Sequence, residues 1–217
     1  MSFCLALTDP DWALTKDVFS IIGTVASAAG VGLAFYVGLV GLSTWQRQLS
    51  GTASHELAKR ALIELYKFRE ALDRVRNPLM LASEFSSAVV STGPQSEAVS
   101  RYLGRCSAYD ERFKLVTEAR RNLDVVLLEA EALWGSDLKL LVKPLHDKSW
   151  DLYHYIENHL LSTDPRIDQA ERAAYVDINK GRPNIMYRRS DVSKDDFARS
   201  FNEDLSKTEV YLRRKLA

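Results

Sequence analysis

The stretch "SIIGTVASAAGVGLAFYVGLVGL", from Ser20 to Leu42, decides how this chain is organised. With Val18 and Phe19 it forms an uncharged segment that would be about 37 Å long as a helix. This length covers the roughly 30 Å hydrocarbon core of a bilayer with some tilt. The segment is also rich in glycine, alanine and serine, which a simple apolar anchor does not need. We therefore expect a transmembrane helix that also contacts another helix.

A cleavable signal peptide and a buried core helix are the two competing interpretations of this segment. A signal peptide begins with positive charge and has a shorter apolar region. Here Asp9, Asp11 and Asp17 outnumber Lys16 before the segment, which favours a membrane span. The chain then divides into a short extracytoplasmic N-terminus (1–17), a transmembrane helix (18–44), a juxtamembrane junction (45–51) and a cytoplasmic helical domain (52–217).

The residues on either side of the span predict its orientation. Trp12 and Trp45 bracket it, as expected for rings that settle at the two headgroup layers. A single lysine precedes the span, whereas Arg47, Lys59 and Arg60 follow it closely. By the positive-inside rule, the N-terminus lies outside and the large C-terminal part lies in the cytoplasm. We expect a single-pass membrane protein, and in a bacterium its N-terminus would face the periplasm.

Small residues gather on one face of the predicted span. At 100° per residue, this face carries Ser20, Gly23, Thr24, Ser27, Gly30, Val31, Ala34, Gly38 and Gly41. The four-residue spacing of Ala26, Gly30, Ala34 and Gly38 allows two helix backbones to approach closely, and the hydroxyl groups can add hydrogen bonds between helices. The pattern predicts association with a second copy or with another membrane protein. The alternative is that glycine and alanine are simply common in membrane helices.

Regular three-four spacing of apolar residues predicts helices after the span, at about 52–76, 96–134 and 137–161, with others starting at Asp164 and at Ser193. The first has an apolar stripe of Leu57, Ala61, Leu65, Phe68, Leu72, Val75 and Leu79. In the second, Arg120 stands at an inward position, unless Ala119 faces inward instead. Strand signals are almost absent. We predict an all-α chain whose cytoplasmic part is an elongated, coiled-coil-like antiparallel helical bundle.

Several short segments carry a resemblance to known proteins. They are "WQRQLSG" (45–51), "ELAKRAL" (56–62), "YKFR" (66–69), "VRNP" (75–78) and "EAEALWG" (129–135). Together they resemble a group of uncharacterised bacterial single-span membrane proteins with a cytoplasmic helical domain. This resemblance implies a bacterial origin and an architecture, and it brings no activity or site residues.

Composition and motifs narrow the function classes. The 29 basic and 29 acidic residues balance, which argues against a nucleic-acid binder. No glycine-rich nucleotide loop or nucleophile-elbow motif stands in a suitable context. His154 and His159 are spaced too far around a helix to hold a metal together, and Cys106 falls on a core stripe. We expect neither a metal nor a cofactor.

The segment "DINKGRPNIMYRRS" (177–190) is the most suggestive soluble stretch, because it holds Lys180, Arg182, Arg188 and Arg189 around a glycine-proline turn. Arginine forks and turn amides suit phosphate or carboxylate groups, such as a nucleotide, a lipid headgroup or an acidic partner segment. The alternative is an ordinary solvated loop.

Three hypotheses follow. The first is a non-catalytic membrane protein that forms homo-oligomers through its span, while its cytoplasmic domain binds a protein partner or an anionic ligand. A more specific form makes it a membrane effector or regulator in stress or phage defence. The contrasting hypothesis is a membrane-tethered enzyme acting on a phosphorylated or nucleotide substrate.

Overall fold

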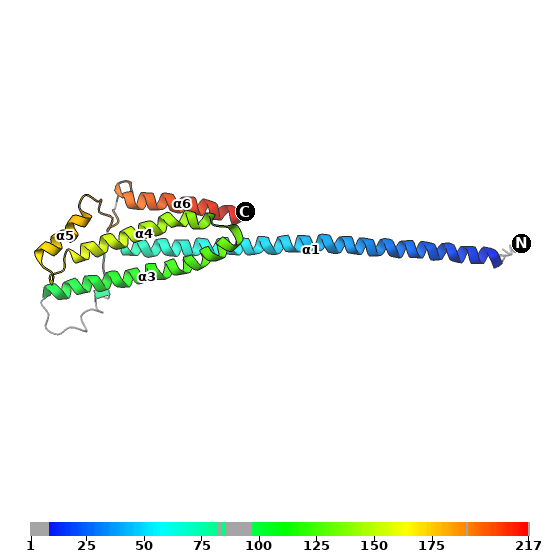
Figure 1. Cartoon of the computed structure of the whole chain (residues 1–217), viewed down its shortest axis with the longest axis horizontal. Coiled ribbons are helices and arrows are strands. Elements are labelled where there is room, and N and C mark those ends of the chain that lie inside the picture. The colour runs from blue at the N-terminus through cyan, green and yellow to red at the C-terminus, as the bar shows by residue number, and fades with distance from the viewer. Residues whose placement is uncertain (1–8, 82–83, 86–96, 190, 217) are drawn as a thin grey trace. The chain divides into compact units, whose positions relative to one another are not determined.

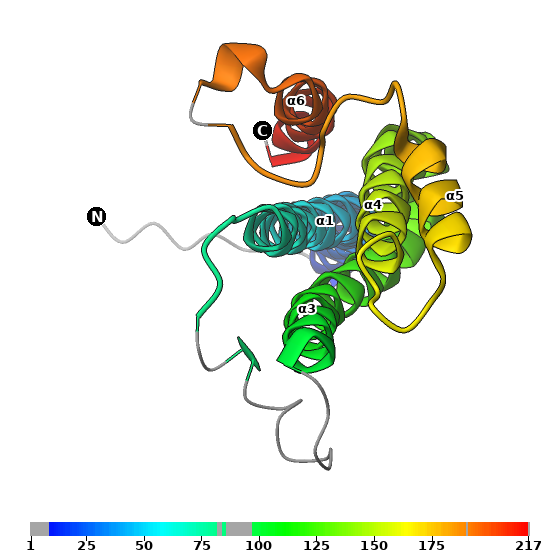
Figure 2. The same cartoon turned by 90° about the vertical axis from the view of Figure 1, so that its left-hand side faces the viewer.

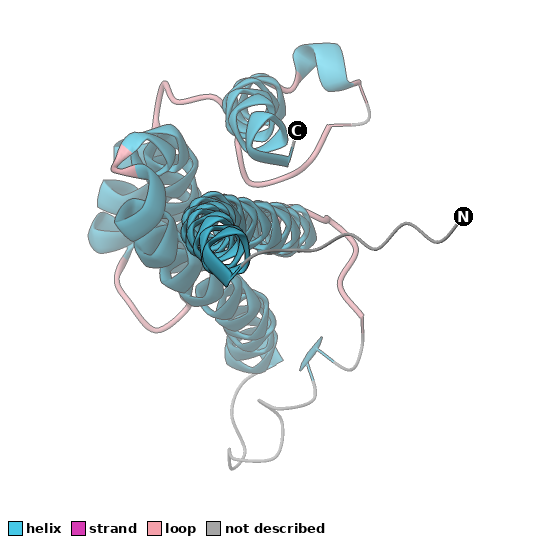
Figure 3. Ribbon diagram, turned by 90° about the vertical axis from the view of Figure 1, so that its right-hand side faces the viewer, coloured by secondary structure: helices cyan, strands magenta, loops and turns pink. Residues whose placement is uncertain are grey.

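The described part of the chain contains helices joined by turns and loops, without strands, which confirms the predicted all-α class. The computed structural model describes residues 9–81, 84–85, 97–189 and 191–216, and no strand occurs among them. The helices are α1 (Asp9–Val75), α3 (Glu97–Trp134), α4 (Asp137–Leu161), α5 (Gln169–Asn179), the short 3-10 helix η1 (Val192–Lys194) and α6 (Asp196–Leu216) (Figures 1 and 3). Two compact units divide the chain, Met1–Ala53 and Ser54–Ala217.

Within the Met1–Ala53 unit, the described residues form the first part of α1. The portion Lys16–Leu42 is long and apolar enough to cross a membrane, and none of its side chains is buried. Large apolar side chains such as Phe19, Val31 and Phe35 are about 70 % exposed, at 70 %, 71 % and 69 %. Length and composition of this kind also occur in signal sequences. The structure thus shows a helix able to span a bilayer.

No close contact within the chain requires glycine at these positions of α1. A Cβ added at Gly23, Gly30, Gly38 or Gly41 would meet no atom within 4 Å. By contrast, Gly135 and Gly181 have positive φ angles of 79° and 78°, which favour glycine. A glycine inside a helix costs about 1 kcal/mol relative to alanine in water. The fold of the single chain therefore leaves the span's glycines unexplained.

The Ser54–Ala217 unit has one hydrophobic core, to which α1, α3, α4 and α6 all contribute. Figure 2 shows these helices end-on, with α1 between the other three. The predicted stripe of α1 is buried from Leu57 to Val75, and Phe68 is completely buried. Leu79 is 76 % exposed, so its predicted inward position is wrong, because α1 ends at Val75 just before Pro78.

The inward side of α3 carries an alanine at position 119 and an arginine at position 112. Ala119 is buried and the Arg120 side chain is 40 % exposed, near Asp124, which confirms the interpretation that Ala119 faces inward. The buried arginine of α3 is Arg112, whose exposed fraction is 6 %. Its Nη1 and Nη2 donate to the carbonyls of Asn77 and Leu79, at 2.7 and 2.6 Å. The cation thereby holds the segment that follows α1.

Two predicted helix starts are wrong because neighbouring aspartates cap the chain elsewhere. The helix expected at Asp164 begins at Gln169, where Asp168 accepts a hydrogen bond from Glu171 N–H at 2.7 Å. Asp164 instead binds Arg166 in the preceding turn. The helix expected at Ser193 begins at Asp196 as α6.

The junction 45–51 is helical, so α1 passes through it without interruption. A separate helix starting at Thr52 was therefore a wrong prediction. The Thr52 hydroxyl donates to the Gln48 carbonyl of the preceding turn at 2.9 Å. Gly51 alone does not end the helix, since a single glycine lowers helix stability without breaking its hydrogen bonds.

Candidate functional site

The four cations of the predicted basic segment are exposed, and the side chains of three of them, Lys180, Arg182 and Arg189, engage different partners. Lys180 pairs with Asp177 in α5, with Nζ and Oδ1 3.3 Å apart. Arg182 Nη2 lies 3.7 Å from an Asp151 carboxylate oxygen in α4. Arg189 donates from Nη1 to the carbonyl of Lys194 in η1 at 2.9 Å, and Arg188 donates its backbone N–H to the Arg76 carbonyl at 2.9 Å.

A buried ion pair anchors the second half of this segment. Arg76 and Asp195 are 2 % and 4 % exposed, and Arg76 Nη2 donates to both carboxylate oxygens at 2.9 and 3.0 Å. Arg76 also donates to the carbonyls of Ile185 and Tyr187, at 2.8 and 3.1 Å. Its guanidinium carbon lies 4.5 Å from the centre of the Phe197 ring. Two carbonyl groups of this segment therefore accept hydrogen bonds from Arg76 and are not available to a ligand.

The carboxylate of Asp195 is held in its charged form by several donors. Burial alone would raise its pKa, but hydrogen bonds from Arg76 and from the backbone N–H groups of Ala198 and Arg189 act in the other direction, and the pKa lies below its usual value. Asp195 Oδ1 accepts from Ala198 N–H at 3.0 Å. The same side chain thus caps α6 and fixes the loop to the end of α1.

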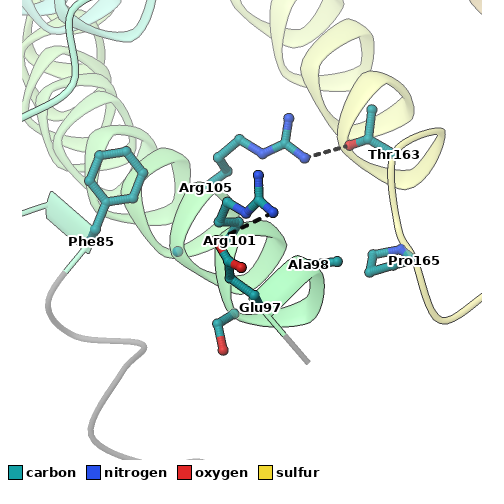
Figure 4. Close-up of a pocket in the computed structure, with 9 residues that line it drawn as sticks. Phe85, Glu97, Ala98, Arg101, Arg105, Thr163 and Pro165 are labelled. Atoms are coloured by element: carbon teal, nitrogen blue, oxygen red, sulfur yellow. Dashed lines mark hydrogen bonds and ion pairs between the residues drawn. The ribbon is translucent and has the colours of Figure 1, made fainter. Parts of the chain in front are cut away.

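A separate pocket of about 820 Å³ lies between the start of α3 and the turn after α4. Figure 4 shows Arg101 and Arg105 on α3, placed between Phe85 and the Thr163–Pro165 turn. Arg105 Nη2 donates to the Thr163 hydroxyl at 3.3 Å, and Arg101 Nη2 lies 3.5 Å from a Glu97 carboxylate oxygen. This volume is within the range of small-molecule sites, about 300–1,000 Å³.

The pocket combines apolar walls with positive charge. Phe85 forms one wall and comes so close to Gly104 that an added Cβ would lie 3.1 Å from its ring. The arginines supply the charge, and Arg105 contributes, after burial, to lowering the pKa of His159. The arrangement suits a small molecule that carries an anionic group on an apolar body.

Sequence reasoning missed this pocket. Its walls come from the start of α3 and from the turn after α4, which are far apart along the chain. The only local signal was the pair of arginines one turn apart on a predicted helix, a pattern that most solvated helices also show.

His146, His154 and Cys106 each have a defined structural environment. His146 packs edge-on against Phe68, with ring centres 5.4 Å apart, and burial lowers its pKa although Asp124 acts in the other direction. His154 Nδ1 lies 3.2 Å from a Glu157 oxygen. Burial raises the pKa of the Cys106 thiol. Within the described ranges, no group of three or more metal-ligating side chains is arranged around one point.

Comparisons of this chain with protein-family models, with curated proteins and with solved structures found no match.

Proposed function

We propose that this chain is a non-catalytic, single-pass protein of the bacterial inner membrane, which self-associates through its span and carries a ligand- or partner-binding domain in the cytoplasm. In this proposal residues 18–44 cross the bilayer and residues 52–217 form an elongated antiparallel helical bundle. The observation that carries it is the apolar portion Lys16–Leu42, none of whose side chains is buried.

The physical reason is the cost of apolar surface in water. Soluble proteins rarely expose continuous apolar patches beyond a few hundred Å². A helix that is apolar all round needs a bilayer or an apolar partner to cover it. The remaining residues, by contrast, build a core of their own. A bilayer around Lys16–Leu42 therefore accounts for the exposed apolar surface, while the remaining residues bury their own apolar side chains.

Membrane insertion and orientation can be tested with the two native cysteines. Because Cys4 and Cys106 flank the span, a membrane-impermeant maleimide added to intact spheroplasts is expected to label Cys4 and to spare Cys106. Lysis should then expose Cys106, and a Cys106→Ser variant identifies its signal. The intact chain should stay with the membranes after an alkaline wash. A soluble product that lacks residues 1–42 would identify a signal sequence instead, and the reverse labelling pattern would overturn the orientation.

Self-association is supported by the small-residue face, which comprises Ser20, Gly23, Ser27, Gly30, Ala34, Gly38 and Gly41. Nothing in the single chain requires glycine at these positions, whereas a neighbouring helix at close range does. The Thr24 hydroxyl donates to the Ser20 carbonyl at 2.9 Å, so its proton is used within the helix. Van der Waals contact between backbones is then the main attraction. A membrane effector in stress or phage defence would need the same property.

Ligand binding is supported best by the pocket between α3 and α4. There Arg101 and Arg105 line one pocket with apolar walls, beside Glu97 and Thr163. In the 177–190 segment, by contrast, Lys180, Arg182 and Arg189 engage partners in three different elements. We assign the pocket to small apolar anions.

Phenyl phosphate is a suitable probe for this pocket, with phenol as the uncharged comparison. An Arg105→Gln variant is expected to bind phenyl phosphate at least about tenfold more weakly, because a hydrogen bond to a charged group contributes about 1.5–3 kcal/mol. Calorimetric titration of the full chain in detergent measures this change. A Lys180→Gln/Arg182→Gln variant should bind normally. If only that variant bound phenyl phosphate more weakly, the anion site would lie in the basic segment 177–190 instead of the pocket.

The membrane-tethered enzyme remains a prediction that no observation favours. It would require turnover of a phosphorylated or nucleotide substrate by the full chain, lost when Arg182 or His154 is replaced.

A further inference from the structure

The C-terminal end of α6 lies beside the first residues of the Ser54–Ala217 unit. Trp134 connects the two, because its Nε1 donates to the Ser54 hydroxyl at 3.0 Å and its ring meets that of Tyr211 with centres 6.4 Å apart. Lys215 Nζ lies 5.4 Å from the centre of the Trp134 ring and 5.5 Å from that of Tyr211. In Figure 1 this end of α6 lies by the turn between α3 and α4, away from α5.

The last turn of α6 concentrates positive charge. It contains Arg213, Arg214 and Lys215. Arg213 and Arg214 are exposed, and neither guanidinium group forms an ion pair or hydrogen bond with another described residue. The free carbonyls at a helix end carry only about half a negative charge. Even with the nearby carboxylate of Asp137, which acts on Tyr211, the three cations leave this end positive.

Two ion pairs near this end carry no net charge: Arg60 with Glu129, and Lys139 with Glu131 at 2.9 Å. Glu209 stands one turn before Arg213 in α6 and offsets one of the three positive charges. Because Arg213 and Arg214 are exposed, the remaining excess lies on side chains that an anion from outside can reach.

Chain length brings this end close to the bilayer if residues 18–44 span it, so this inference rests on the proposed function. From Leu42 to Ser54 the chain covers about 18 Å as a helix. Trp134 binds Ser54, and Lys215 packs on Trp134. The last turn of α6 therefore lies at the end of the domain where α1 enters it. Arg47, which follows the span, adds a further positive charge in the sequence.

We propose that the last turn of α6 binds the anionic phospholipid headgroups of the membrane that the span crosses. Each lysine or arginine near an anionic surface raises the affinity about fivefold. Arg213 and Arg214 make the contact, while the aromatic pair Trp134 and Tyr211 holds Lys215 beside them. The contact orients the helical domain on the membrane surface, with the pocket between α3 and α4 at the opposite end of α3 from Trp134.

The test uses the full chain in nanodiscs of phosphatidylcholine alone or of phosphatidylcholine mixed with phosphatidylglycerol, analysed by amide hydrogen exchange. Exchange in residues 208–216 is expected to be about tenfold slower with the anionic lipid, and this difference should disappear at high salt. In an Arg213→Gln/Arg214→Gln variant the difference should fall below about twofold. The matched control, Lys180→Gln/Arg182→Gln, removes two exposed cations near α5 and should keep the full difference.

The outcomes separate this proposal from the one on which it rests. Protected amides at 18–42 together with lipid-independent exchange at 208–216 would overturn the headgroup contact alone. Faster exchange of the arginine variant by the same factor in both lipids would also overturn it, since the cations would then only stabilise the helix end. Unprotected amides at 18–42 in both nanodiscs would overturn the membrane span and the headgroup contact together.

Discussion

An Asp195→Ala variant is expected to lower the free energy of unfolding of the Ser54–Ala217 unit by about 3–5 kcal/mol, because it leaves a buried guanidinium without its carboxylate. Arg76 would keep only the neutral carbonyls of Ile185 and Tyr187 as acceptors. The change also removes the acceptor for Ala198 N–H at the start of α6. Urea unfolding of the full chain in detergent, followed by tryptophan fluorescence, measures the loss.

Two variants serve as controls for this prediction. Asp196→Ala removes the neighbouring aspartate, whose ion pair with Arg199 is exposed, and should cost less than about 1 kcal/mol. Arg76→Leu/Asp195→Ala should be more stable than Asp195→Ala, since no unpaired charge is then buried. The buried pair would have no special role if Asp195→Ala cost no more than Asp196→Ala.

The same pair makes stability depend on acid pH. The pKa of Asp195 in the folded chain lies below its ordinary value of 3.8, so its ionised form stabilises the fold at neutral pH. This contribution is complete above the ordinary value and is lost as the pH falls from about 4 through the lowered pKa. Unfolding measured over this range should show a shallower acid loss in Asp195→Asn. An unchanged slope would show that other carboxylates dominate.

The second large effect is expected in the membrane. Replacing Gly30 and Gly38 by leucine should weaken self-association at least about tenfold, or about 1.4 kcal/mol, because the two backbones can no longer approach closely. Neither position has any neighbour within 4 Å of an added Cβ in the single chain, so the helix itself accepts the larger side chains. Energy transfer between labelled copies in lipid vesicles measures the association.

A matched change on the opposite face tests whether geometry or mere volume is responsible. Ile22→Leu/Val40→Leu keeps bulky residues where bulky residues already stand, and it should leave association unchanged. Equal association of the wild type and the Gly30→Leu/Gly38→Leu variant, or a wild type that stays monomeric, would contradict the close-packed interface.

The regular helices were predictable because their signals are local. Gly135 ends α3 in the left-handed conformation, and α4 has the predicted bounds, Asp137–Leu161. The α1 stripe from Leu57 to Val75 is buried as its spacing indicates. Helix starts were less predictable, since Asp164 and Asp168 are equally good caps in the sequence. Only the partner taken by each, Arg166 or the N–H of Glu171, separates them.

The basic segment illustrates the limit of a local signal for function. The sequence alone predicted its charges and the turn at Gly181. Where the charges of its second half lie depends on Arg76 and Asp195, which come from distant parts of the sequence, and Arg182 lies near Asp151 of α4. Arg112 was missed for the same reason, because its acceptors belong to the segment after α1.

By itself the sequence determined the helical class, the apolar stretch around Ser20–Leu42 and the face on which its small residues gather, because periodicity and hydrophobicity are properties of neighbouring residues. Only the tertiary structure decided which charges are buried together, where α3 and the turn after α4 form a pocket, and that Lys215 lies on Trp134, which binds Ser54. Those arrangements depend on contacts between residues far apart in the chain, and such contacts form only when the helices pack around a common core.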